Sequence, residues 1–384
     1  MGDSEGMTPA SSPGFVEQQV LITDADPTPK TCGGEAVGSS SCCTLAEAKQ
    51  QFSSGQQPST SCVVVQGMCV PIAVATELLG SGPAAQQQVE PSDGKASEPE
   101  SAKLMRALLA EAIGTCMIVL FGCGSVCSSL SGAYSGIWQV AAVWGFGVAL
   151  AIYSTADASG AHLNPAITLA FYLVRPEAHG MTVQKSLLYV AAQFLGGIIG
   201  GAINLGVYSS TIKAFERSIS CTRGDPCSIK SALAFGEYFP NPGLSVEWGS
   251  GPYSQDDVSP FYAMCVEGWG TLILAFVIFG ITNSANKSLE CSLGRPGVPF
   301  MIGATVSVLL ALYAPITQAG WNPARDFGPR LVAAMAGWGE VAIPGPRSGF
   351  WVYIVGPCLG APIGAALAEH VLWRPVKKCG LRSL

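Results

Sequence analysis

The chain has 384 residues and a formal net charge of −6 at pH 7, with 49% hydrophobic and only 12% charged residues. Charged residues make up about a quarter of an average soluble protein, so this chain carries about half the usual share. The negative charge argues against a nucleic-acid partner, and the scarcity of charge argues against one large soluble core with amphipathic helices. The composition therefore favours a protein that resides in the lipid bilayer.

The N-terminal part of the chain differs from the rest. Its first hundred residues are rich in Ser, Gly, Pro and Gln and contain twelve acidic residues against three lysines. Such a composition predicts a disordered, acidic tail, which we place at residues 1–102. The segment 62–79 is more apolar, but Gln66, Pro71 and Glu77 interrupt it, so a seventh membrane span there is the less favoured interpretation.

Beyond the tail, the charged residues leave long uncharged gaps. A transmembrane helix needs roughly 20 mostly apolar residues, and the first gap, between Glu111 and Asp157, is long enough for two such helices. The gaps predict six spans, at 104–128, 137–156, 186–208, 261–282, 298–317 and 349–371. The predicted fold class is an all-α membrane protein. Its channel domain, 103–372, consists of repeat one (103–212), a long connector (213–259) and repeat two (260–372), and a short C-terminal tail (373–384) follows.

Lysine and arginine are distributed unevenly between the two sides of this predicted bundle. One side receives Lys103, Arg106, Arg175, Lys185, Lys287, Arg295, Arg374, Lys377, Lys378 and Arg382. The short loop on the other side contains none, and the long connector counts for less. Because basic loops stay in the cytoplasm, both termini are expected there, in a plasma membrane or an internal membrane.

A tripeptide that starts helices occurs twice, as Asn164-Pro165-Ala166 and as Asn322-Pro323-Ala324. Asn caps a helix and Pro fits the first helical position. A helix that starts within a membrane is tolerated only where its open end faces a water-filled cavity. We therefore expect a pore between two half-helix N-termini, whose positive partial charge opposes cations while the Asn amides contact a permeating oxygen.

The two halves of the channel domain repeat each other. Glu111 and Glu267 lie in similar sequences, Ala-Glu-Ala-Ile-Gly-Thr and Val-Glu-Gly-Trp-Gly-Thr, and stand 53 and 55 residues before Asn164 and Asn322. Each half has three spans, an odd number, so the second copy must be inverted in the membrane. We expect both intramembrane glutamates to hold the irregular backbone before each motif, with a proton relay as the less favoured alternative.

The sequence gives no support for an enzyme. It has no phosphate-binding loop and no metal-ligand spacing, and its three histidines, at 162, 179 and 370, lie near no convincing nucleophile. We therefore expect no catalytic residue, no metal and no cofactor. A secondary transporter remains an alternative, because inverted repeats with broken helices serve that class too.

These motifs resemble those of the aquaporin and glycerol-facilitator family, the major intrinsic proteins. The resemblance is carried by Ser-Gly-Ala-His-Leu-Asn-Pro-Ala at 159–166 and by Asn-Pro-Ala-Arg at 322–325, and it covers roughly residues 103–372. It implies six membrane helices with two half-helices that meet at mid-membrane, in a homotetramer with one pore in each subunit. It also implies passive conduction of small neutral solutes and water, with exclusion of ions and protons.

Family spacing implies a selectivity filter of four residues, namely Trp144, Leu310, Ala319 and Arg325. Trp144 and Arg325 resemble the choice of the glycerol-conducting branch, the aquaglyceroporins, because Trp gives an apolar face and Arg gives donors for hydroxyls. Asp326 also resembles that branch, and an acid there could orient the guanidinium of Arg325. Leu310 and Ala319 depart from the facilitators. Glycerol is therefore the first expectation, with urea and ammonia as further candidates and a water-selective pore as the alternative.

Three further residues have candidate roles. His162 lies two residues before Asn164, at the expected cytoplasmic vestibule, where protonation could gate flow; a histidine fixed by hydrogen bonds in the loop is the favoured alternative. Cys221 and Cys227 lie in the connector on the expected non-cytoplasmic side, where a disulfide between them is a hypothesis.

Overall fold

The structure is a computed structural model, which describes residues 43–44, 62–65, 68–71, 98–244, 251–286 and 294–373. The chain divides into two compact units, residues 1–95 and 96–384. In the first unit, β2 (Cys62–Val65) pairs in parallel with β1 (Cys43–Thr44) and antiparallel with β3 (Met68–Pro71). These strands are not among the predicted elements. At the end of the predicted disordered tail, residues 98–102 are described as well, and residues 100–102 belong to the first long helix, so the tail ends earlier than predicted. The remaining tail residues lie outside the described ones.

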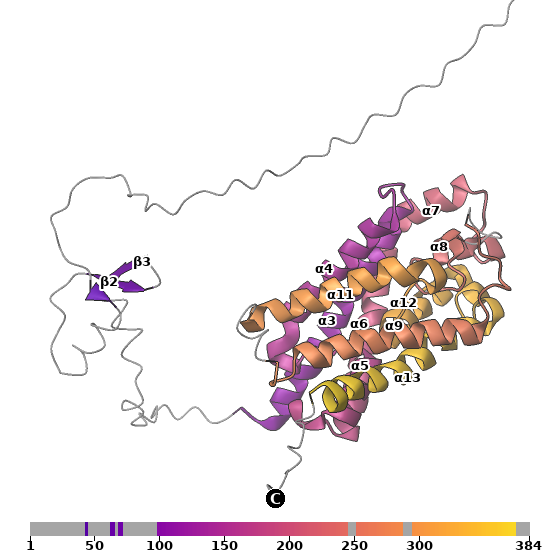
Figure 1. Ribbon diagram of the computed structural model, residues 1–384. Coiled ribbons are helices and arrows are strands. Elements are labelled where there is room, and N and C mark those ends of the chain that lie inside the picture. The colour runs from indigo at the N-terminus through magenta and orange to yellow at the C-terminus, as the bar shows by residue number, and fades with distance from the viewer. Residues whose placement is uncertain are drawn as a thin grey trace, which may run out of the picture. The chain divides into compact units, whose positions relative to one another are not determined.

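The second unit contains six helices that are long and apolar enough to cross a membrane, which confirms the six predicted spans. They are α3 (Glu100–Ser129), α4 (Ile137–Ser159), α6 (Val183–Val207), α9 (Pro260–Ile281), α11 (Gly294–Thr317) and α13 (Val352–Ala366). Two short turns, η6 (Pro346–Trp351) and η7 (Leu367–Leu372), extend α13 at its ends. The helices lie side by side in one bundle (Figure 1). The described part of this unit is helical, as the predicted fold class requires.

Two shorter helices lie within this bundle. These are α5 (Pro165–Val174), of 10 residues, and α12 (Pro323–Ala333), of 11 residues. At 1.5 Å per residue each is about 15 Å long, roughly half the hydrocarbon thickness of a bilayer. Helix α5 of the first repeat packs on α13 of the second, and α12 of the second repeat packs on α6 of the first. The two repeats therefore interlock, and each one positions the half-helix of the other.

Glycines allow the long helices of each repeat to approach one another closely. A Cβ atom at Gly196 of α6 would collide with the main-chain carbonyl of Ala112 in α3. The equivalent contact of the second repeat places Gly360 of α13 against the main-chain carbonyl of Gly268 in α9. Small residues at such crossings bring helix backbones together in membranes, where packing replaces the hydrophobic effect as the main source of stability.

The connector folds at one end of the bundle. Helix α7 (Ser209–Ser218) begins in repeat one and runs into the connector, which also contains η2 (Pro226–Ser228), α8 (Ile229–Ala232) and η3 (Pro242–Leu244). The end of α12 continues into η4 (Ala334–Trp338) and η5 (Gly339–Val341). One short turn, η1 (Pro176–Ala178), links α5 to α6. Helices α7 and α8 lie at the end of the bundle opposite to the start of α3 and the end of α13 (Figure 1).

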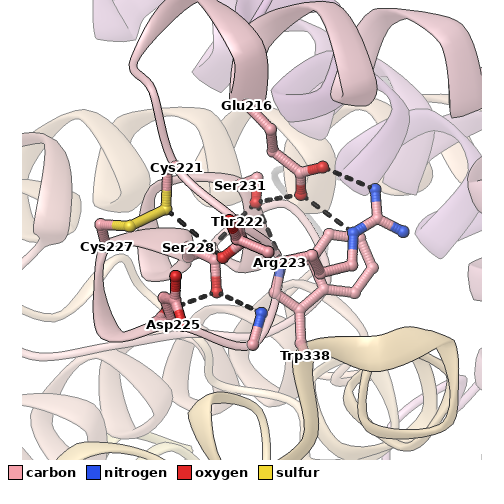
Figure 2. Close-up of a disulfide and its surroundings, with 10 residues drawn as sticks. Glu216, Cys221, Thr222, Arg223, Asp225, Cys227, Ser228, Ser231 and Trp338 are labelled. Carbon is pink, nitrogen blue, oxygen red and sulfur yellow. Dashed lines mark hydrogen bonds and ion pairs between the residues drawn. A yellow bond between two sulfur atoms is a disulfide. The ribbon is translucent and has the colours of Figure 1, made fainter.

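A disulfide closes a loop of the connector. Cys221 and Cys227 are bonded, with their Cα atoms 6.0 Å apart (Figure 2). Arg223 inside the loop pairs with Glu216 of α7, at 3.0 Å between Nε and Oε1, and its guanidinium carbon lies 3.9 Å from the centre of the Trp338 ring. The loop is therefore fixed both to the connector helix and to the segment that follows α12.

Candidate functional site

Each half-helix begins at the asparagine of its motif. The Oδ1 atom of Asn164 accepts a hydrogen bond from the main-chain N–H of Ala166 at 2.9 Å. The Oδ1 atom of Asn322 accepts from the N–H groups of Ala324 and Arg325 at 3.1 and 3.2 Å. A proline follows each asparagine at the first helical position. Capping by Asn and pre-organisation by Pro therefore start both helices.

The two helix starts are also bonded to each other. The Nδ2 atom of Asn164 donates to the carbonyl oxygen of Trp321 at 2.9 Å, and the Nδ2 atom of Asn322 donates to the carbonyl oxygen of Leu163 at 2.8 Å. An Asn amide has two N–H donors, so one donor of each residue is left for a molecule in the adjacent cavity, which both asparagines line. The positive ends of the two helix dipoles meet at this place.

A buried glutamate in each repeat holds the backbone before the motif. The carboxylate of Glu111 accepts hydrogen bonds from the main-chain N–H groups of His162 and Leu163 at 3.0 and 2.7 Å. Glu267 accepts from the two N–H groups immediately before Asn322, at 3.1 and 2.9 Å. Both glutamates are fully buried. They lie where the sequence analysis placed them, against the irregular segments.

The backbone held by these glutamates has unusual torsion angles. The residues three and one positions before each asparagine have positive φ, at 48° and 51° for Ala161 and Leu163 and at 68° and 48° for Ala319 and Trp321. A residue with a side chain adopts this region at a cost of roughly 1–2 kcal/mol. The same strain at the same two positions of both repeats shows that the surrounding hydrogen bonds impose this path on the chain.

A cavity of about 570 Å³ runs along this backbone. It is lined by both motif asparagines, by His162, and by all four residues of the predicted filter, Trp144, Leu310, Ala319 and Arg325. A second cavity, of about 290 Å³, is also lined by Trp144, Leu310 and Arg325. These three side chains therefore stand between the two cavities, and each is only 3–4% exposed.

Trp144 and Arg325 are in direct contact. The guanidinium carbon of Arg325 lies 4.0 Å from the centre of the Trp144 ring, which is a cation–π arrangement. The contact places the N–H donors of a cation beside an apolar aromatic face. A molecule that has hydroxyl groups on one side and carbon on the other finds a matching surface here.

The acid that pairs with Arg325 is not the one expected from the sequence. Asp326 accepts hydrogen bonds from Arg330 at 2.8 and 3.1 Å, because residues four apart lie on the same face of α12. Arg325 forms its ion pair with Glu237 of the connector instead. Asp326 acts on Arg325 only through Glu237, because its carboxylate accepts a hydrogen bond from the main-chain N–H of Glu237 at 2.6 Å. The support that we expected Asp326 to give directly is therefore indirect.

Sequence reasoning missed Glu237 altogether. It lies in the sequence Phe-Gly-Glu-Tyr-Phe-Pro at 235–240, which forms no motif considered in the sequence analysis, and 88 residues separate it from Arg325. The sequence does contain one indication of its role, because an acidic residue among aromatic residues is often buried in an ion pair. This indication does not identify the partner of the pair.

His162 is held by two polar contacts. Its Nδ1 atom lies 3.2 Å from the hydroxyl of Thr168, and its Nε2 atom lies 2.9 Å from Nδ1 of His179. Burial lowers the pKa of His179, and the nearby charges of Lys185 and Arg175 lower it further, so His179 is neutral at pH 7. These contacts agree with a histidine fixed by hydrogen bonds, and gating by its protonation stays a prediction.

Comparison with known proteins agrees with this geometry. The sequence profile described as Major intrinsic protein matches residues 98–368. The chain is 38% identical over 272 residues to a glycerol uptake facilitator protein of Pseudomonas aeruginosa, covering 68% of this chain and 89% of that protein. It is 36% identical over 277 residues to a propanediol uptake facilitator of Salmonella typhimurium, covering 71% and 96%.

A solved structure shares the fold. The aquaglyceroporin from Plasmodium falciparum superposes with a TM-score of 0.57 at 23% sequence identity, covering 70% of this chain and 97% of that one. The part of the chain that the family profile matches contains both half-helices and both motifs. The chain therefore belongs to the major intrinsic protein family, as an integral membrane protein that spans the bilayer several times.

Proposed function

We propose that this chain is a passive transmembrane channel for glycerol and other small neutral solutes, with water, and that it excludes ions and protons. The observation that carries the proposal is the central cavity, which both motif asparagines and the Trp144–Arg325 pair line. The relatives named as glycerol and propanediol uptake facilitators support small polyols as the solutes. Urea and ammonia are further candidates of the same size class.

A solute that moves along the cavity contacts the filter residues first and the motif asparagines next. Arg325 donates hydrogen bonds to the hydroxyls of a solute while the ring of Trp144 contacts its carbon atoms. Asn164 and Asn322 then donate to its oxygen atoms at the centre. A cation loses hydration here and meets the positive ends of two helix dipoles. A water molecule bound through its oxygen to both amides points its hydrogens away from the centre, which opposes proton transfer along a water chain.

We also propose a homotetramer with one pore in each subunit, and both termini in the cytoplasm. The start of α3 and the end of α13 lie at the end of the bundle opposite to α7 and α8 (Figure 1). A disulfide at Cys221–Cys227 suits an oxidising compartment on the connector side, in agreement with this orientation. A plasma membrane or an internal membrane is compatible with it.

Stopped-flow light scattering on proteoliposomes tests the function, first under a water gradient and then under a glycerol gradient. We expect fast, non-saturating glycerol entry that is lost in the Asn322→Leu and Arg325→Leu variants. Lys213→Gln, an exposed connector residue, is the matched control and should leave both fluxes unchanged. Water flux without glycerol flux would indicate a water-selective pore. Saturable uptake coupled to an ion gradient would indicate a secondary transporter.

A further inference from the structure

The connector places one acidic residue at the filter with its backbone fixed on both sides. The N–H of Glu237 donates to Asp326 at 2.6 Å, and its carbonyl oxygen accepts a hydrogen bond from Arg330. The next N–H, of Tyr238, donates to Oε1 of Gln318 at 2.8 Å. Glu237 is 4% exposed. The backbone of Glu237 is therefore held by two side chains of α12 and by a side chain of the segment before the second motif.

Four buried charged residues at this end of the cavity form two pairs. Arg330 and Asp326 bond to each other, and Arg325 pairs with Glu237. All four residues are at least nine-tenths buried, so solvent screens these pairs weakly. The guanidinium of Arg325 therefore stands beside a carboxylate, and the filter presents a donor and an acceptor of opposite charge side by side.

The position of Glu237 relative to the two cavities shows from which side a solute meets the Arg325–Glu237 pair. Glu237 lines the smaller cavity, on the connector side, whereas Arg325 lines both cavities. Lys230 and Gln318 also line the smaller cavity. A solute that enters from the connector side meets the carboxylate and the guanidinium together, before it reaches the motif asparagines.

We propose that Glu237 is a specificity-determining residue of this pore, an inference that rests on the proposed function. Its carboxylate accepts a hydrogen bond from one hydroxyl of the solute while Arg325 donates to the hydroxyl on the adjacent carbon. Two adjacent hydroxyls satisfy both charged groups at once, whereas hydroxyls separated by a further carbon satisfy them less well. The pair therefore selects vicinal diols, glycerol among them, over 1,3-diols and over water.

The test compares 1,2-propanediol, 1,3-propanediol, glycerol and water in proteoliposomes, each corrected for protein-free liposomes. The wild-type protein should conduct 1,2-propanediol about tenfold faster than 1,3-propanediol, which is the effect expected of one charge-assisted hydrogen bond. Glu237→Gln keeps the size of the side chain but removes its charge, so both this preference and the glycerol-to-water ratio should fall by about tenfold. Glu237→Asp keeps the charge on a shorter side chain and should give intermediate ratios.

Asp225→Asn is the matched control, because it removes the same charge from an exposed position of the connector and should leave the ratios unchanged. Unaltered ratios in both Glu237 variants would overturn the inference. If Glu237→Gln does not fold, the wild-type diol series and Glu237→Asp still decide it. Wild-type glycerol flux without any preference between the two diols overturns this inference alone, whereas absence of wild-type glycerol flux overturns the proposed function.

Discussion

Replacement of Glu111 by glutamine tests how the backbone before the first half-helix is held. The carboxylate accepts four hydrogen bonds, from the Ser159 hydroxyl at 2.6 Å, the N–H groups of His162 and Leu163 at 3.0 and 2.7 Å, and Nε2 of Gln193 at 2.7 Å. A glutamine amide has only one oxygen, and its NH₂ group would face some of these donors. At least two of the four donors therefore lose their acceptor in the Glu111→Gln variant.

The size of the effect follows from these contacts. A buried donor that is left unsatisfied costs about 1–3 kcal/mol. Two such donors lower the free energy of unfolding by about 2–6 kcal/mol. For a domain of this size, about 1 kcal/mol corresponds to roughly 2–4 °C in the midpoint of thermal unfolding, so the midpoint should fall by at least about 4 °C. Glu111→Ala leaves all four donors unpaired and should cost more.

The assay is thermal unfolding of the purified protein in detergent, followed by glycerol flux of the same preparations. Glu177→Gln removes a carboxylate from an exposed position in η1 and serves as the matched control, with no expected change. A Glu111→Gln protein that unfolds within about 1 °C of the wild type would refute the reasoning, because the two main-chain N–H groups would then have other acceptors.

Three further changes test other parts of the structure. Gly360→Ala places a Cβ against the carbonyl of Gly268 and should lower the free energy of unfolding by about 1–3 kcal/mol; an unchanged unfolding midpoint would contradict this packing. Removing the disulfide with the double change Cys221→Ser and Cys227→Ser should cost about 2 kcal/mol, and reductant should then destabilise the wild type but not the variant. Because the pKa of His179 is lowered in the folded protein, the unfolded chain binds a proton at this residue more readily. The contribution of His179 to stability is therefore present above pH 6.5 and is lost as the pH falls below that value and through the lower pKa of the folded state. His179→Ala should flatten the decline of the unfolding midpoint over this acidic range, and an equally steep decline would show that other groups cause it.

The sequence by itself determined the local features of this protein. Uncharged stretches of about 20 residues specify membrane helices because lipid tolerates little else. Asn followed by Pro favours a helix start through contacts between near neighbours, and Asn164 and Asn322 cap their helices accordingly. Glu111 and Glu267 could be placed because an ionisable group within a span needs polar partners, and the irregular backbone was the nearest set of donors.

Only the tertiary structure decided which distant groups meet. Asp326 stands next to Arg325 in the sequence, yet the helical repeat turns it toward Arg330. The connector then brings Glu237 to Arg325 across 88 residues, along a path fixed by hydrogen bonds to α12. Helix periodicity and capping act over a few neighbouring residues and leave a trace in the sequence. A buried ion pair depends on where two separate segments are packed, so its partners become known only when the fold brings them together.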